Sequence, residues 1–204
     1  MTDREAFGAA FNVSRETLDH FDTYSALLHE WQSRMNLVGP STLPSIWERH
    51  FTDSAQLLAI GGPAKSWLDI GAGAGFPGLV IALLDSHAHV TLVESIAKKC
   101  RFLSEAASRL GVGGRVSVEN RRIENLPRAT FEIVTARALA ALDQLFDWAL
   151  PYAGPDTRWI LPKGARVEDE LTIASNRFAF DYSLIPSRTD AAARIVVAKG
   201  VTRR

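Results

Sequence analysis

Cysteine is almost absent from this chain of 204 residues, which contains only Cys100. A single thiol excludes an intramolecular disulfide and a metal site built from several cysteines, and it is typical of a reducing compartment. Net charge is absent too, because 23 Lys and Arg balance 23 Asp and Glu. A protein that coats nucleic acid non-specifically usually has a strongly basic surface, so the balance argues against that class.

Long apolar runs are also missing. No stretch approaches the roughly 20 apolar residues of a membrane-spanning helix. Met1 is followed by the polar run Thr2-Asp3-Arg4-Glu5, not by the basic and apolar segments of a secretion signal. We therefore expect a cytoplasmic, monomeric protein that binds neither a membrane nor a metal. Its 47% of hydrophobic residues suffices for the core of one compact domain.

After residue 65 the chain alternates short apolar runs with segments of helical length. The apolar runs predict strands and the segments between them predict helices: strands at 66–70, 89–94, 115–119, 131–136 and 157–162, and helices at 76–85, 95–110, 139–150 and 165–175. This alternation predicts an α/β fold with a mostly parallel sheet and right-handed crossovers. The runs 178–185 and 194–199 are too close for another crossover, so they predict a C-terminal antiparallel hairpin.

Residues 1–64 predict an N-terminal helical cap ahead of a domain that spans residues 65–204. The apolar spacing indicates a helix over 14–33 with Ser14 as its N-cap. A second helix is expected from Pro44 to about Ile60, ended by Gly61-Gly62-Pro63.

The most informative segment is WLDIGAGAGFPG, residues 67–78, in which a buried strand ends in a glycine-lined turn and a helix begins. Bare backbone at Gly71, Gly73 and Gly75 permits unusual dihedral angles and lets a ligand approach the main chain. The first N–H groups of the next helix lack intrahelical acceptors and carry partial positive charge. The turn therefore predicts a small-molecule site.

The spacing of this turn indicates which molecule it holds. The dinucleotide fingerprint requires a third glycine where Phe76 stands, which disfavours an NAD-dependent oxidoreductase. The actual spacing, Asp69-x-G-x-G-x-G, resembles the first motif of S-adenosylmethionine-dependent methyltransferases, where the acid can meet the cofactor's amino group. A second acid, Glu94, ends the strand 89–94, where such folds hold ribose hydroxyls with a carboxylate.

The residues at the end of the fourth strand indicate which kinds of methyl acceptor are disfavoured. Enzymes that methylate exocyclic amines commonly carry Asn or Asp, then Pro-Pro and an aromatic, whereas this chain has Arg137-Ala138. No cysteine is present there to attack a pyrimidine ring. A ring nitrogen with a free lone pair needs neither, and alignment with the methyl group is then the main requirement. Arg137 holds the cofactor, the loop or a substrate phosphate, or it pairs with Glu94, Glu124 or Asp53. Lys163 is similarly placed, or is a solvated loop residue.

Taken together, these motifs resemble the RsmG family, also called GidB. The resemblance spans residues 25 to 164 and rests on Trp31 with Asn36-Leu37, Arg49-His50 with Asp53-Ser54, Asp69 to Gly78, Lys98-Lys99 with Phe102-Leu103, Arg122 to Glu124, Arg137-Ala138 and Lys163-Gly164. It implies a Rossmann-like fold and an S-adenosylmethionine-dependent enzyme that methylates N7 of a guanosine in bacterial small-subunit (16S) ribosomal RNA, free or in a ribosomal particle. After about residue 165 the match is only general.

The resemblance and the turn together predict the site residues. The cofactor contacts are expected at Asp69, Gly71, Ala72, Gly73, Gly75, Phe76, Glu94, Ile123, Glu124 and Arg137. RNA contacts are expected at Arg34, Arg49, His50, Arg121 and Lys163. Arg137 and Lys163 position charge, and no general base is expected. Two alternatives remain: a methyltransferase of a small metabolite, and a non-catalytic RNA-binding module that has retained the fold.

Overall fold

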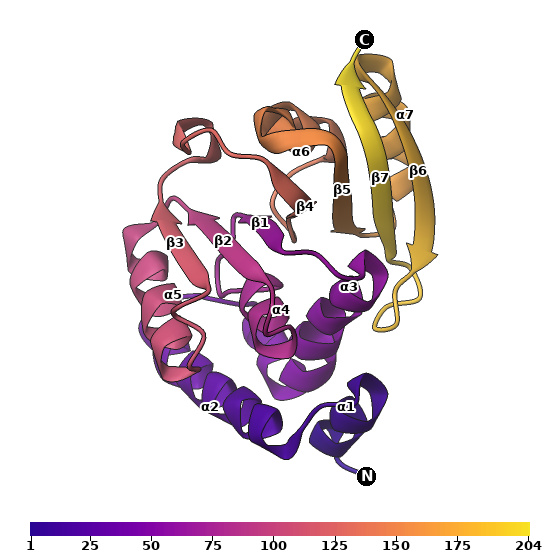
Figure 1. Ribbon diagram of the computed structural model, residues 1–204. Coiled ribbons are helices and arrows are strands. Elements are labelled where there is room, and N and C mark those ends of the chain that lie inside the picture. The colour runs from indigo at the N-terminus through magenta and orange to yellow at the C-terminus, as the bar shows by residue number, and fades with distance from the viewer.

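The computed structural model describes residues 1–204 and has a seven-stranded sheet at its centre (Figure 1). The strands are β1 (Ser66–Ile70), β2 (His89–Glu94), β3 (Val116–Asn120), β4 (Phe131–Thr135), β5 (Ala153–Lys163), β6 (Phe178–Pro186) and β7 (Arg194–Arg203). Their order across the sheet is β3-β2-β1-β4-β5-β7-β6. The first five strands are parallel, and β7 is antiparallel to both β5 and β6. The predicted parallel sheet with a C-terminal antiparallel hairpin is confirmed.

The crossover helices divide between the two faces of the sheet. They are α4 (Gly78–Leu84), α5 (Ala97–Arg109), α6 (Leu142–Ala149) and α7 (Val167–Arg177), with short 3₁₀ turns η3 (Ile123–Asn125) and η4 (Leu150–Tyr152). One core holds Trp67 and Leu92 of the sheet together with residues of α4 and α5. The other holds Phe146 of α6 and Trp159 of β5 with residues of α7. Because both faces are covered, the inner strands read as continuous apolar runs.

The N-terminal cap packs on the α4 and α5 side and belongs to the same core (Figure 1). It consists of α1 (Asp3–Phe11), α2 (Arg15–Gln32), the 3₁₀ helix η1 (Pro40–Ser45), the π-helix η2 (Trp47–Thr52) and α3 (Asp53–Gly61). The predicted helix over 14–33 is confirmed, and Ser14 caps it by accepting a hydrogen bond from the Thr17 N–H.

The prediction of one helix from Pro44 to Ile60 is wrong, because this stretch passes through three helical types. Pro44 has no N–H to donate, and it lies within the 3₁₀ turn η1. The wider π-turn that follows buries both His50 and Phe51. Such π-turns often occur at functional sites. No element was predicted for the first helix, α1, although Thr2 and Glu5 form a capping box at its start.

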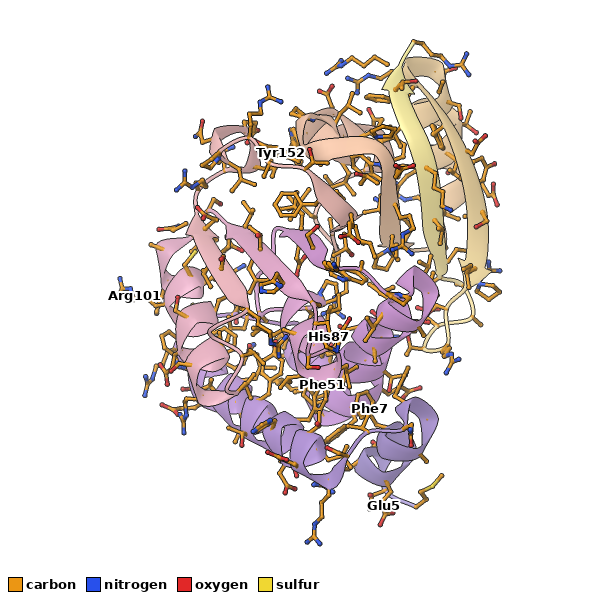
Figure 2. The ribbon with its side chains drawn as sticks, in the orientation of Figure 1. Glu5, Phe7, Phe51, His87, Arg101 and Tyr152 are labelled. Carbon is orange, nitrogen blue, oxygen red and sulfur yellow. The ribbon has the colours of Figure 1, made fainter.

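Aromatic rings connect the cap to the glycine-lined turn. Phe7 of α1 contacts Phe21 of α2, and Phe21 contacts Phe51 of η2, each at 4.9 Å between ring centroids. Phe51 in turn lies 5.9 Å from Phe76. Figure 2 shows Phe7 and Phe51 close together where the cap meets the rest of the chain. The cap therefore fixes the position of Phe76, a predicted site residue.

Candidate functional site

The turn between β1 and α4 has the backbone that its glycines allow. Gly71, Gly73 and Gly75 have φ of 70°, 56° and 89°, values that residues with a Cβ rarely adopt. The Gly71 N–H donates to the carbonyl of Val93, which ties the turn to β2. The turn thus exposes main chain at the carboxyl ends of β1 and β2, where open α/β sheets bind ligands.

Asp69 supports this turn from behind. Its Oδ2 accepts a hydrogen bond from the Gly78 N–H at 2.9 Å, whereas its Oδ1 has no hydrogen-bond partner. Burial raises the pKa of this carboxyl to about 7; the Gly78 hydrogen bond and the charge of Arg137 oppose the shift, and Glu94 adds to it. Asp69 is fully buried and lines neither cavity described below. The position of Asp69 therefore gives no support to the predicted contact between its carboxyl group and the cofactor's amino group.

Gly75 also lies behind the turn, since a Cβ there would come within 2.6 Å of the Tyr24 hydroxyl. That hydroxyl donates a hydrogen bond to the Ala74 carbonyl, and burial raises the pKa of Tyr24 well above its usual value. Gly75 lines neither cavity, so its predicted contact with the cofactor stays a prediction.

A cavity of about 360 Å³ opens over the ends of β1, β2 and β3; we call it the β2–β3 cavity. Its walls combine apolar side chains with charged ones of both signs. The apolar residues include Ile123, Leu139 and Trp148, the acids are Glu94 and Glu124, and the basic residues are Lys99, Arg121 and Arg122. Glu94 accepts hydrogen bonds from the N–H groups of Gly73 (3.1 Å) and Ile96 (2.8 Å). Its carboxylate is therefore fixed at the junction of the turn and β2.

The short turn η3 carries Ile123 and Glu124 into this cavity. It is held by Tyr152, whose hydroxyl lies 2.6 Å from the Ile123 carbonyl oxygen and 3.0 Å from that of Leu126. The structure thus brings Gly71, Glu94, Ile123 and Glu124 together, as the sequence predicted.

A second cavity, of about 520 Å³, lies between the turn, the cap and the β6–β7 loop (residues 187–193); we call it the cap cavity. Gly71, Ala72, Gly73 and Phe76 line it, and Arg137 lines it from the end of β4. Gly71 belongs to both cavities, so the exposed main chain of the turn connects them.

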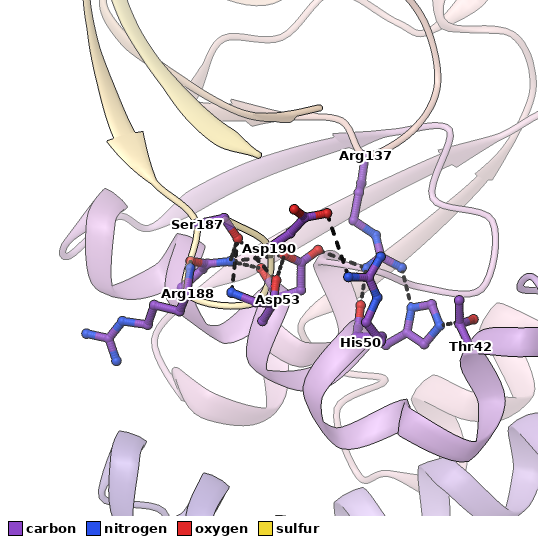
Figure 3. A network of polar contacts seen from close by, with 10 residues as sticks. Thr42, His50, Asp53, Arg137, Ser187, Arg188 and Asp190 are labelled. Carbon is purple, nitrogen blue, oxygen red and sulfur yellow. Dashed lines mark hydrogen bonds and ion pairs between the residues drawn. The ribbon is translucent and has the colours of Figure 1, made fainter. Parts of the chain in front are cut away.

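Arg137 is held by the cap on one side of this cavity (Figure 3). Its Nη1 donates to the Asp53 Oδ2 (3.1 Å) and to the Arg49 carbonyl (3.2 Å), and its Nη2 lies 2.8 Å from the His50 Nδ1. The guanidinium carbon lies 4.9 Å from the centroid of the Phe76 ring. Of the alternatives that the sequence left open, the ion pair with Asp53 is present, and Arg137 still lines the cavity.

His50 is buried beside Arg137 and stacks on Phe76 with ring centroids 4.9 Å apart. Burial, together with the charges of Arg137 and Arg49, lowers the pKa of His50 to about 3. The imidazole is therefore neutral at physiological pH.

The β6–β7 loop contributes residues that the sequence did not reveal. Thr189 donates a hydrogen bond to the Asp53 Oδ1 at 2.8 Å, and Gln56 accepts one from the Arg188 N–H at 3.0 Å (Figure 3). These contacts join segments more than 130 residues apart, 136 for Thr189 and Asp53. Local spacing carries no signal for them, so only the folded chain shows that the hairpin closes the cap cavity.

Lys163 is neither solvated nor free. Its Nζ donates to the Ala140 carbonyl at 2.6 Å and pairs with the Glu170 Oε2 at 2.8 Å, and only 8% of the residue is exposed. The reading as a solvated loop residue is wrong. Lys163 lines the cap cavity and braces the loop that follows β4, which carries Ala138 at φ 54° and Leu139.

The predicted RNA contacts do not form one cluster. Arg49 and His50 line the cap cavity and Arg121 lines the β2–β3 cavity. Arg34 lines neither cavity and pairs with Glu30 on the surface of the cap. No group of three or more His, Cys, Asp or Glu side chains is arranged to bind a metal ion, and no helix has the length and apolarity needed to cross a bilayer.

A family model described as rRNA small subunit methyltransferase G, GidB, matches residues 17–193. The chain belongs to the GidB family. Among the relatives, the "Ribosomal RNA small subunit methyltransferase G" of Methylorubrum populi is 49% identical over 94% of this chain and 92% of its own length. The protein of the same name from Hyphomonas neptunium is 44% identical over 99% of this chain and 97% of its own length.

Solved structures show that this GidB-family chain has the methyltransferase fold. An O-methyltransferase from Bacillus cereus in complex with SAH is similar with a TM-score of 0.58 at 16% identity, over 92% of this chain and 91% of that one. A SAM-dependent O-methyltransferase from Thermotoga maritima is similar with a TM-score of 0.60 at 16% identity, over 87% of this chain and 71% of that one. At these identities the likeness concerns the fold alone.

The residues of the two cavities fit an adenosyl amino acid. Apolar walls at Ile123 and Leu139 suit an adenine ring, and the fixed carboxylate of Glu94 suits ribose hydroxyls. Main chain without a Cβ at Gly71 and Gly73 then leads to the cap cavity, where Arg137 offers charge for a carboxylate. Behind this turn, the buried Oδ1 of Asp69 has no hydrogen-bond partner in the protein and is a free acceptor.

Proposed function

We propose that this protein transfers a methyl group from S-adenosylmethionine to N7 of a guanosine in the 16S RNA of the small ribosomal subunit, and that it works as a cytoplasmic monomer. The observation that carries the proposal is that Gly71 of the glycine-lined turn borders both the β2–β3 cavity and the cap cavity. Membership of the GidB family supports the choice of substrate.

The donor's two halves would occupy the two cavities. The adenosine half belongs in the β2–β3 cavity, with Glu94 on the ribose and Ile123 and Glu124 on the base. The amino-acid half belongs along Gly71 to Gly73, with its carboxylate toward Arg137. When bound, this donor supplies a methyl group on a positively charged sulfur.

Methylation at N7 does not require the protein to remove a proton from the acceptor. The N7 lone pair of guanine lies on the major-groove edge and is already free. As the N7–CH₃ bond forms, the S–CH₃ bond breaks and its electron pair stays on sulfur, so the positive charge moves to the guanine and no proton leaves. The protein's contribution is alignment, which accounts for about 7–11 kcal/mol of the barrier in favourable cases.

We place the guanine N7 and the donor's methyl group in the cap cavity. This cavity is bordered by His50, which is neutral, and by Arg137, which is paired with Asp53. A-form RNA hides the N7 edge in a deep, narrow groove. The target guanosine must therefore come from an unpaired or opened segment and leave its stack to reach the cavity.

The test uses purified protein, labelled S-adenosylmethionine, and ribosomal RNA from a strain lacking this gene, offered both as naked 16S RNA and as 30S particles. We expect one labelled guanosine, whose N7 modification makes the strand cleavable by borohydride and aniline. Unlabelled RNA, with transfer to a small metabolite when one is added to the assay, would favour the first alternative. RNA binding without transfer would favour a non-catalytic RNA-binding module. In calorimetry, NADH binding without binding of S-adenosylhomocysteine would instead favour an NAD-dependent oxidoreductase.

A further inference from the structure

The hydrogen bonds around His50 run in one direction. The Thr42 hydroxyl donates to the Gly39 carbonyl at 2.7 Å, so its oxygen is free to accept from the His50 Nε2, also at 2.7 Å. At the other side of the ring, the Arg137 Nη2 lies 2.8 Å from Nδ1. An arginine nitrogen only donates, so Nδ1 must carry the lone pair. The hydrogen bonds on the two sides of the imidazole therefore require the same neutral tautomer, with the proton on Nε2.

The protein uses only part of the donor capacity of Arg137. A guanidinium has five N–H donors, and Asp53, the Arg49 carbonyl and His50 take three of them. The Nε–H and one N–H of Nη2 have no acceptor in the protein, although the guanidinium borders the cap cavity. Because the three partners come from η2 and the start of α3, the cap sets the orientation of the remaining donors.

We propose that His50 is a positioning residue: as a neutral acceptor it holds the Arg137 guanidinium against the Phe76 ring, so that the two remaining N–H groups receive the carboxylate of the methyl donor. Burial and the neighbouring charges, which lower the pKa of His50, support this reading. His50 itself then touches neither RNA nor the methyl group. The inference rests on the proposed function, because it assigns Arg137 to the amino-acid half of S-adenosylmethionine.

Two ligands separate this role from a purely structural one. S-adenosylhomocysteine has the carboxylate, whereas 5′-methylthioadenosine has the same nucleoside and sulfur without it. In His50→Ala we expect the Kd for S-adenosylhomocysteine to rise about tenfold or more, as for a lost hydrogen bond to a charged group. The Kd for 5′-methylthioadenosine should stay within about twofold. His29→Ala, which changes an exposed histidine of α2, is the matched control.

A double-mutant cycle then tests whether His50 acts through Arg137. If it does, adding His50→Ala to Arg137→Met changes the Kd for S-adenosylhomocysteine by less than about twofold further. Equal losses for both ligands, or additive losses in the cycle, would overturn the inference. If the wild-type protein binds neither ligand, the proposed function fails instead.

Nuclear magnetic resonance of the intact protein tests the same assignment without relying on a His50 variant that folds. With ¹⁵N-labelled histidine, we expect His50 to show a protonated Nε2 and an unprotonated Nδ1 from neutral pH down to about pH 5, where an ordinary histidine is charged. In Arg137→Met its pKa should move back toward 6.5, because one of the charges that lowers it is gone. A His50 that titrates near 6.5 in the wild-type protein, or that carries its proton on Nδ1, would contradict the proposal.

Discussion

The Asp69 Oδ2 accepts a hydrogen bond from the N–H of Gly78 at 2.9 Å, and this contact ties the end of β1 to the first residue of α4. The turn that exposes its main chain to both cavities is thus closed from behind by a buried carboxyl group. A fully buried carboxyl with one unpartnered oxygen resists ionisation, which is why its pKa rises.

The burial of the Asp69 carboxyl makes the free energy of unfolding depend on pH in a defined direction. The Asp69 carboxyl keeps its proton to about pH 7 in the folded chain but loses it near 3.8 when unfolded, so folded protein binds more protons within that window. The free energy of unfolding therefore falls as pH rises from about 4 to about 7. Asp69→Asn, which keeps an acceptor for Gly78, should remove this decline. Urea unfolding at about pH 4 and pH 7 measures the free energy of unfolding of both proteins. If the difference in this free energy between Asp69→Asn and the wild type is the same at both pH values, the prediction is wrong.

His50 should act in the opposite direction over an overlapping range. Its pKa is about 3 in the folded chain against 6.5 in the unfolded one, so the unfolded chain binds more protons in between, and stability rises with pH across that window. His50→Gln should flatten this rise. The double variant His50→Gln/Asp69→Asn should lose both slopes, and urea unfolding as a function of pH checks it. An unchanged slope in His50→Gln would mean that the pKa of His50 is the same in the folded and unfolded chains, which contradicts the prediction.

The glycines of the turn should differ in what they control. Gly73→Val places a branched side chain at φ 56° with no close neighbour except the Gly71 carbonyl at 3.7 Å. We expect it to abolish S-adenosylhomocysteine binding while costing about 1–2 kcal/mol of stability. Gly111→Val, at φ 70° with nothing within 4 Å, is the matched control for backbone strain and should bind normally. Calorimetry and thermal unfolding separate the effects; normal binding by Gly73→Val would remove the turn from the site.

Gly78→Ala should lower the stability of the protein through overpacking. Its Cβ would lie 2.2 Å from the Leu92 Cδ2 and 2.8 Å from the Asp69 Oδ2, so overpacking should lower the free energy of unfolding by about 1–3 kcal/mol. Chemical denaturation measures this loss. A fully stable Gly78→Ala protein would show that the junction of β1 and α4 is loosely packed.

Lys163→Met tests whether this residue braces the site or contacts RNA. Removing the ammonium leaves the Ala140 carbonyl without its donor and the Glu170 carboxylate without its counter-charge, with only the Leu142 N–H still bonded to it. We expect a loss of about 1–3 kcal/mol in stability. Donor affinity should fall as well, because the loop carrying Leu139 loosens. Adding Glu170→Gln should restore part of the stability, since it removes the uncompensated charge. Normal stability and donor affinity with lost RNA methylation would instead assign Lys163 to the RNA.

The sequence predicted the sheet and the turn well because their signals are local. Continuous apolar runs mark strands buried on both faces, and glycines mark positive φ. The cap was harder, since the π-turn at His50 depends on packing against Phe76, a residue far along the chain. Three acids were candidates for Arg137, and the choice of Asp53, 84 residues away, depends on how the cap sits on the domain. The contribution of Thr189 had no local signal at all.

A crystal structure with S-adenosylhomocysteine bound is the most direct test of the central claim, that the turn after β1 holds the methyl donor across both cavities. We expect the adenine between Ile123 and Leu139, the ribose on Glu94 and the carboxylate within hydrogen-bonding distance of Arg137. The nucleoside bound outside the β2–β3 cavity, or the amino-acid half directed away from Gly71 to Gly73, would contradict the account.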